Sequence, residues 1–188
     1  AFASAEVLDV VSVMDVYRTF THYPFYFAGT FVRTKALQAG EWHLEYGIEA
    51  EREFFLTLLA RVREVVYLSD VIYQGSRAQE GDPVFYKEIY NPDWYFKSLR
   101  EFWQPYLAHW SEQKDGIPRF IQYHFMFSIG CRVNSNKDNQ NKHVIPSGQE
   151  RDFLRLMGEL FQYIDDEVLF DYLRIPECKQ LDSMLWVY

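Results

Sequence analysis

The chain has 188 residues, of which 48% are hydrophobic, and its formal net charge at pH 7 is −8. This composition supplies enough apolar surface for a folded core and excludes an intrinsically disordered chain. The acidic balance argues against nucleic acid as a ligand, because contact with a phosphate backbone requires a basic surface.

The first half of the chain alternates helical and strand-like patterns. Residues 4–20 carry apolar side chains at helical spacing and predict a helix, and residues 25–32 are aromatic and β-branched and predict a buried strand. A short helix is expected at 33–37. Residues 48–63 predict a helix with an acidic start and a basic end, and 65–73 a second strand. We expect both strands to share one sheet, with the intervening helix packed on it.

The second half is predicted to be helical and rich in aromatic residues. Asn91 followed by Pro92 and an acid is typical of a helix start, and Pro105 should kink the helix that follows. We expect the helices at 92–114, 118–132 and 147–164 to pack as one aromatic-rich bundle against the α/β part. The predicted segments are a polar loop at 75–83, helices at 92–114, 118–132, 147–164 and 165–173, and a polar loop at 134–142.

The chain therefore divides into an α/β part, residues 1–80, and a mostly helical C-terminal extension, residues 81–188. Neither part contains the glycine-rich G-x-G-x-x-G or G-x-x-x-x-G-K-[ST] pattern of a phosphate-binding loop. The predicted fold class is α/β with few strands, followed by helices.

The cysteine and histidine residues indicate no metal site. Cys131 and Cys178 form no C-x-x-C pair, which disfavours structural zinc and is typical of reduced thiols in a cytosolic protein. No H-E-x-x-H pair occurs, and His124, on an aromatic helix, is expected to be a core residue. No uninterrupted apolar run approaches the ~18 residues that span a bilayer.

One acidic cluster precedes and opens the helix predicted at 48–63. It is either a solvated helix start or a group of site carboxylates at the mouth of a sheet, where a helix follows a strand. The residues around Trp42 and His43 are Glu41, Glu45, Glu49, Glu51 and Glu53.

Three stretches resemble segments of bacterial family 2 glycosyltransferases with the GT-A fold. GTFVRTKAL at 29–37 resembles their G-K-x-F-R-R-E-L-L segment, EAEREFFLTLL at 49–59 resembles their E-D-x-x-F helix start, and VVYLSDVIYQGSR at 65–77 resembles their strand and exit loop. The helical half is similar to the tails of capsule and teichoic-acid-type envelope enzymes.

This resemblance implies transfer of a sugar from a nucleotide-sugar donor to an acceptor hydroxyl, with Mg²⁺ or Mn²⁺ bridging the donor diphosphate in the whole enzyme. The chain contains no D-x-D metal motif, and a complete GT-A domain is larger than residues 1–80. We therefore expect the acceptor-side, C-terminal half of a larger protein, which binds no metal and is inactive by itself.

Residue by residue, Glu51 and Phe55 fall on the Glu and Phe of E-D-x-x-F. Arg52 falls on the Asp, which in the family is the general base that takes the acceptor's proton. Arginine cannot take this role because it stays protonated. Glu49 or Glu51 would then be the catalytic base.

The resemblance also implies substrate-binding residues. Tyr73 and Arg77 match a Y-x-x-x-R exit, and Arg77 would clamp the donor diphosphate, because guanidinium matches phosphate oxygens geometrically. Trp42 and Tyr46 are candidates for stacking against a sugar ring.

The implied partners are a nucleotide-sugar and a glycan acceptor of the cell envelope, and the implied location is the cytoplasm, with peripheral association at the inner face of the membrane left open. Two alternatives remain. One is a glycosyltransferase-like module without catalysis that binds a partner or a glycan through its helical tail. The other is a stand-alone interaction protein.

Overall fold

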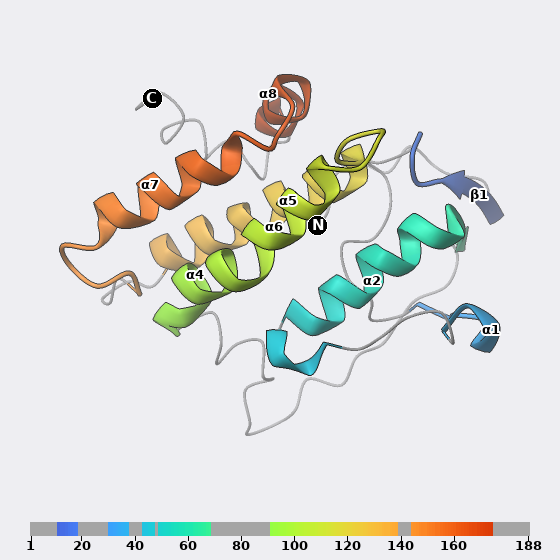
Figure 1. The fold of residues 1–188 in the computed structure, drawn as a ribbon, viewed down its shortest axis with the longest axis horizontal. Helices are drawn as coiled ribbons and strands as arrows, with labels where there is room; N and C mark the ends of the chain where they lie inside the picture. Colours follow the sequence, from blue (N-terminus) through green and yellow to red (C-terminus); the bar gives the residue numbers. More distant parts are fainter. Residues whose placement is uncertain are drawn as a thin grey trace. The chain divides into compact units, whose positions relative to one another are not determined.

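The computed structural model describes residues 11–18, 30–37, 43–47, 49–68, 91–138 and 144–174. The chain forms two compact units, Ala1–Gly81 (unit 1) and Asp82–Tyr188 (unit 2). Helices account for 68% of the described residues, and the two described strands form one small sheet (Figure 1). The described structure is thus a helix-rich α/β arrangement.

Unit 1 pairs two short strands in antiparallel fashion. Strand β1 (Val11–Asp15) lies beside β2 (Glu64–Leu68), with Val13 opposite Val66 and Met14 opposite Val65. Side chains alternate between the two faces of a strand, so Met14 is buried, whereas Val13 and Val66 are 66% and 60% exposed on the other face.

Helix α2 (Glu49–Val62) supplies most of the buried apolar residues among those that the structure describes in unit 1. It follows helix α1 (Thr34–Leu37) and the 3-10 turn η1 (Leu44–Tyr46). The hydroxyl of Tyr17, just beyond β1, donates to the carbonyl of Ala60 at 3.3 Å and so ties the sheet to the helix. The buried residues of α2 are Glu49, Ala50, Phe54, Phe55, Leu56, Leu58 and Leu59.

The chain passes directly from α2 into β2 at Arg63. Its φ of 62° lies in the left-handed region, which few residues with a side chain adopt. Two contacts hold it there: Nε donates to Asp15 Oδ2 at 3.2 Å, and the guanidinium lies 5.0 Å from the centre of the Tyr17 ring. This tight turn folds β2 back alongside β1.

The helix predicted over 4–20 is wrong in its described part, because residues 11–15 form β1. β-branched side chains at Val11 and Val13 favour extended backbone, and the hydrogen bonds to β2 stabilise it. An apolar spacing that fits a helix also fits a strand over such a short stretch.

The strand predicted over 25–32 is not formed at 30–32, and its remaining residues lie outside the described ones. The segment predicted over 65–73 is a strand, β2, in its described part. In the described residues it pairs with β1 (Val11–Asp15). The helix predicted over 48–63 is confirmed as α2, and the one over 33–37 as α1.

Unit 2 begins with a continuous helical rod. It consists of α4 (Pro92–Ser98), the π-helical turn η2 (Leu99–Trp103) and α5 (Gln104–Ser111). The predicted start is confirmed, since the Asn91 side chain accepts from the Asp93 backbone N–H at 3.0 Å. Pro105 has no N–H to donate, and the helix widens to a π turn immediately before it. The sequence predicts a kink at Pro105, and the structure shows a π-helical turn on its N-terminal side.

Helix α6 (Arg119–Asp138) lies at the centre of unit 2, since every side chain from 120 to 126 is buried. His124 is among them, as predicted. The loop predicted from 134 onward is wrong at its start, because α6 continues to Asp138. The Asn136 side chain accepts from the backbone N–H groups of Val144 and Ile145, at 3.0 and 3.3 Å, which stabilises this last part of the helix.

Helices α7 (Glu150–Phe161) and α8 (Asp166–Arg174) follow, near their predicted positions. The start of α8 is fixed to α6 by a reciprocal pair of hydrogen bonds. Gln122 Nε2 donates to Asp165 Oδ2 at 2.9 Å, and the Asp165 backbone N–H donates to Gln122 Oε1 at 2.7 Å. Tyr123 donates to Asp171 at 3.2 Å, and burial raises the pKa of Tyr123 to about 12.

A single buried guanidinium joins α4 to α6. Arg132 is fully buried and donates to the Trp94 carbonyl at 3.0 Å, to the Ser128 carbonyl at 3.1 Å and to the Ser98 hydroxyl at 2.7 Å. Its guanidinium also lies 4.3 Å from the centre of the Trp94 ring. The planar fork of arginine suits several acceptors at once.

Replacing Trp103 tests the aromatic core of unit 2. Its ring is fully buried and meets the Phe125 ring edge-on at 5.2 Å. Trp103→Ala is expected to lower the free energy of unfolding by about 3–5 kcal/mol. The control Phe170→Ala removes a side chain that is 60% exposed and should change it by about 0.5 kcal/mol or less. Equal urea midpoints for the two variants would contradict this packing.

Arg132→Lys tests the buried guanidinium while keeping its charge. We expect a loss of about 2–3 kcal/mol of unfolding free energy, because lysine cannot replace all three hydrogen bonds and leaves acceptors unsatisfied. Arg151→Lys, at an exposed position on α7, is the matched control. Urea unfolding measures both, and identical stabilities would show that the hydrogen bonds of Arg132 contribute nothing.

Candidate functional site

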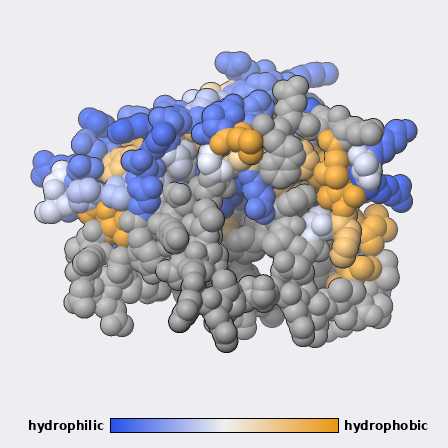
Figure 2. All heavy atoms as spheres, turned by 90° about the horizontal axis from the view of Figure 1, so that it is seen from below, coloured by the Kyte–Doolittle hydropathy of each residue, from blue (hydrophilic) through white to orange (hydrophobic). Residues whose placement is uncertain are grey.

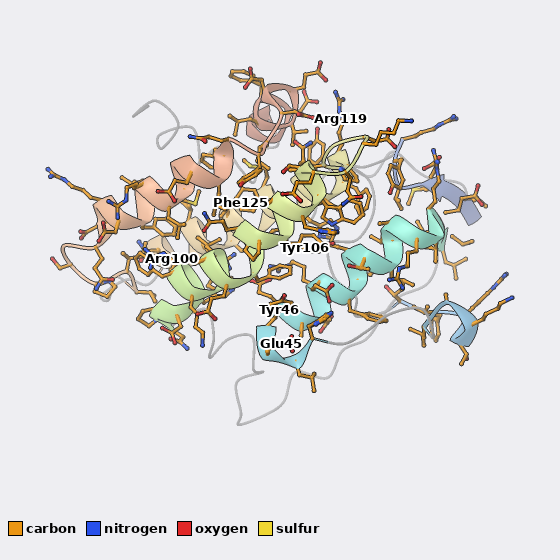
Figure 3. All side chains as sticks on the ribbon, viewed as in Figure 1. Glu45, Tyr46, Arg100, Tyr106, Arg119 and Phe125 are labelled. Carbon is orange, nitrogen blue, oxygen red and sulfur yellow. The ribbon has the colours of Figure 1, made fainter. Side chains whose placement is uncertain are left out.

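Three of the predicted site residues can be placed in unit 1. Tyr46 ends the turn η1 (Figure 3). Glu49 and Glu51 lie in the first turn of α2. The other predicted site residues lie outside the described ones: Trp42, Tyr73 and Arg77.

The structure separates the two predicted bases by their surroundings. Glu49 is only 1% exposed, and its Oε2 accepts from Arg52 Nη1 at 2.6 Å. Arg52, at the position of the motif's Asp, therefore forms an enclosed ion pair with Glu49. Glu51 is exposed to solvent. Of the two, only Glu51 is accessible to a ligand.

A third carboxyl group, that of Glu53, lies in the second turn of α2 beside η1. It is partly buried, and its Oε1 accepts from the Thr57 hydroxyl at 3.2 Å. Its Oε2 is buried and has no hydrogen-bond partner in the part of the chain that the structure describes. A buried carboxylate oxygen without a donor is an unsatisfied acceptor, a feature that calls for a functional or structural explanation.

His43 and Glu45 lie close enough to act electrostatically on Glu53. His43 Nδ1 is 3.1 Å from Glu45 Oε1, and the His43 ring centre is 5.7 Å from that of Tyr46. Figure 3 shows Glu45 and Tyr46 on the turn that leads into α2. We name His43, Glu45, Tyr46 and Glu53 the α2 acidic cluster.

Burial raises the pKa of the Glu53 carboxyl above its ordinary value. The hydrogen bond from Thr57 and the positive charges of His43 and Arg61 oppose this rise, whereas the negative charge of Glu45 adds to it. Carboxyl groups with a raised pKa beside specific charge partners are common at functional sites.

Gly47 explains how the sequence brings the cluster together. Its φ of 57° and ψ of −123° turn the chain between η1 and α2, in a conformation that glycine adopts without steric cost. The turn returns His43 and Glu45 toward the second turn of α2. The acidic composition of this stretch is visible in the sequence, but the burial that distinguishes Glu53 from Glu49 and Glu51 is not.

Among the residues that the structure describes, no three His, Cys, Asp or Glu side chains are grouped so that they could hold a metal ion. The Mg²⁺ or Mn²⁺ implied for the whole enzyme is therefore not fitted by these residues. No chemical step proposed below uses a metal.

Comparison of the chain with protein-family models, with curated proteins and with solved structures finds no match. Within the described ranges, no helix combines the length and apolar character needed to cross a membrane.

The pKa of Glu53 predicts a pH-dependent effect of Glu53→Gln. Folding raises the pKa of the Glu53 carboxyl. The protonated carboxyl therefore contributes fully to stability below the pKa of the unfolded chain, and this contribution is lost as the pH rises through the pKa of the folded chain. The uncharged Gln should therefore give a higher Tm than wild type at about pH 7, and the difference should vanish near about pH 3.

Thermal unfolding monitored by circular dichroism at both pH values measures this difference. Glu51→Gln, on the exposed side of the same helix, is the control and should change the Tm little at either pH. A lower Tm for Glu53→Gln at neutral pH would show that the folded chain stabilises the charged form of Glu53.

Proposed function

We propose that this chain is the acceptor-side part of a glycosyltransferase, which moves a sugar from a nucleotide-sugar donor to a cell-envelope polysaccharide or a teichoic-acid-like acceptor. The observation that carries the proposal is the partly buried Glu53, with one carboxylate oxygen unsatisfied within the described residues, beside His43, Glu45 and Tyr46. The resemblance of the 49–59 segment to an acceptor-side motif supports the reaction class.

Glu53 is the proposed general base. Its raised pKa lies closer to neutral pH than that of an ordinary carboxyl group, and a general base is most effective when its pKa is near the working pH. The acceptor hydroxyl donates to the partly exposed Glu53 carboxylate, and its oxygen forms a bond to the anomeric carbon of the donor sugar. The hydroxyl proton passes to Glu53 while the bond from the anomeric carbon to the diphosphate oxygen breaks, and the nucleoside diphosphate leaves.

The neighbouring residues have supporting roles in this proposal. Glu45 orients the His43 imidazole through their hydrogen bond at the edge of the site. Tyr46 is partly exposed and offers a ring face to the apolar side of a sugar. Glu51 is the accessible alternative base, and the diphosphate clamp stays assigned to Arg77, with Trp42 and Tyr73 as further contacts.

A second candidate function is a glycan-binding module without catalysis. It is favoured by the ion pair of Arg52 with Glu49, because Arg52 stands where the resembling enzymes have their base. The two candidates differ in the role of Glu53. A binding module needs the surface of Tyr46 but no proton transfer, whereas the transferase needs Glu53 in its charged form.

Donor binding tests the assignment to the acceptor side. The isolated chain is expected to bind UDP-glucose, UDP-galactose and UDP-N-acetylglucosamine with a Kd no tighter than about 1 mM in the presence of Mn²⁺, equivalent to about −4 kcal/mol. Calorimetry measures this affinity. Micromolar binding that EDTA abolishes would place a complete donor site in this chain and would contradict the proposal.

Acceptor binding tests the cluster itself. A glycerol-phosphate oligomer and an N-acetylglucosamine trisaccharide serve as probes in NMR chemical-shift titrations. The chemical-shift response of η1 and α2 to at least one probe should be lost in Tyr46→Ala and retained in Leu44→Ala, because Leu44 is 77% exposed in the same turn. Glu53→Gln should retain binding but remove its pH dependence. Absence of this response with both probes, or an equal response in Tyr46→Ala, would overturn the proposed site.

A further inference from the structure

A polar groove runs along unit 2 between the α4–η2 rod and α7. It consists of two adjoining hollows of about 310 Å³ and 470 Å³, which share Arg100 and Asp152 in their walls. Figure 3 labels Arg100 on the side of the rod that faces α7. Pockets of about 300–1,000 Å³ are typical of small-molecule sites, so each hollow is at the small end of that range.

Arg100 occupies the junction of the two hollows. It is exposed, its guanidinium carbon lies 5.6 Å from the centre of the Phe96 ring, and it forms no ion pair within the described part of the chain. The other guanidinium of the groove, that of Arg155, already donates to Asp152 at 3.0 Å. Arg100 is therefore the guanidinium of the groove that remains available to a ligand.

The remaining walls present acceptors and one amide. Asp93 and Glu159 add carboxylates, Gln149 adds a group that both donates and accepts, and Pro92, Pro146 and Leu156 supply small apolar surfaces. Three carboxylates and two guanidinium groups thus line the groove, which leaves it close to neutral.

This mixture discriminates among ligand classes. A phosphate group would face three carboxylates, and an apolar ligand would desolvate the charged walls without replacing their hydrogen bonds to water. A hydroxyl-rich ligand can donate to Asp93, Asp152 and Glu159 and accept from Arg100. Two neighbouring hydroxyls of a sugar ring can donate to the two oxygens of one carboxylate, or accept from two N–H groups of one guanidinium.

We propose that the groove between α4–η2 and α7 binds a short neutral oligosaccharide, with adjacent sugar units in its two hollows. Arg100 donates to both units from the junction, and Glu159 and Asp93 accept hydroxyl hydrogen bonds at the two ends. In the upper part of Figure 2, hydrophilic side chains cover most of the described surface, with smaller hydrophobic patches between them. The groove shares no residue with the α2 acidic cluster, so this proposal does not rest on the proposed function.

The test is titration of the full chain with maltotriose, cellotriose and the N-acetylglucosamine trisaccharide, followed by NMR chemical shifts. We expect at least one probe to bind with a Kd below about 10 mM and to shift the signals of Arg100, Gln149 and Glu159. Arg100→Ala and Glu159→Gln should each weaken binding about tenfold or more. These side chains lie at the surface, so thermal unfolding of the variants should match wild type.

Matched controls are Arg151→Ala, on the same helix α7 but outside the groove, and Glu112→Gln, an exposed acid beyond α5. Both should bind like wild type. Unchanged affinity in both groove variants, or no binding of any trisaccharide at about 10 mM, would overturn the proposal. Tighter binding of inorganic phosphate or of a short acidic peptide at the same signals would also overturn it.

One further variant separates the two sites. Tyr46→Ala removes the proposed acceptor contact in unit 1 and should leave the groove shifts intact. If Tyr46→Ala abolishes all binding while Arg100→Ala retains it, the sugar binds only at the α2 acidic cluster and the groove proposal fails. If Arg100→Ala abolishes all binding while Tyr46→Ala retains it, the groove proposal is supported and the proposed acceptor site fails.

Discussion

The buried guanidinium of Arg132 is the interaction on which the packing of unit 2 depends. A buried charge is tolerated only where its donors find acceptors, and Arg132 meets this condition by bonding to the Trp94 carbonyl, to Ser98 and to Ser128. These bonds fix α4 against the central helix α6. They thereby hold the start of the rod whose next turn carries Arg100.

In unit 1, too, a buried charged group is stabilised by a direct partner. The ion pair of Glu49 with Arg52 satisfies an enclosed carboxylate at the start of α2, and Gly47 turns η1 back toward the helix. Glu53, one turn further, keeps one carboxylate oxygen that no described residue satisfies. Neighbouring acids on one helix thus serve different purposes, because one is paired and another is partly buried beside His43 and Glu45.

The two candidate sites differ in the chemistry they can perform. The α2 acidic cluster combines a partly buried carboxyl of raised pKa with an aromatic ring, a combination suited to accepting a proton from a bound hydroxyl. The groove of unit 2 combines an exposed guanidinium, which forms no ion pair with any described residue, with carboxylates and an amide, a combination suited to binding without reaction.

The sequence by itself determined the elements whose signals are local. These are α2 from its apolar stripe and charge pattern, the start of α4 from Asn91 and its neighbours, α7 from apolar spacing, and α8 from its acidic start. Only the tertiary structure decided the rest. Residues 11–15 became a strand because β2, far along the chain, supplies their hydrogen bonds. The last part of α6 is stabilised because the Asn136 side chain accepts hydrogen bonds from Val144 and Ile145, which follow later in the chain. The raised pKa of Glu53 and the buried hydrogen bonds of Arg132 both result from burial. Burial depends on the packing of distant residues and leaves no local pattern in the sequence.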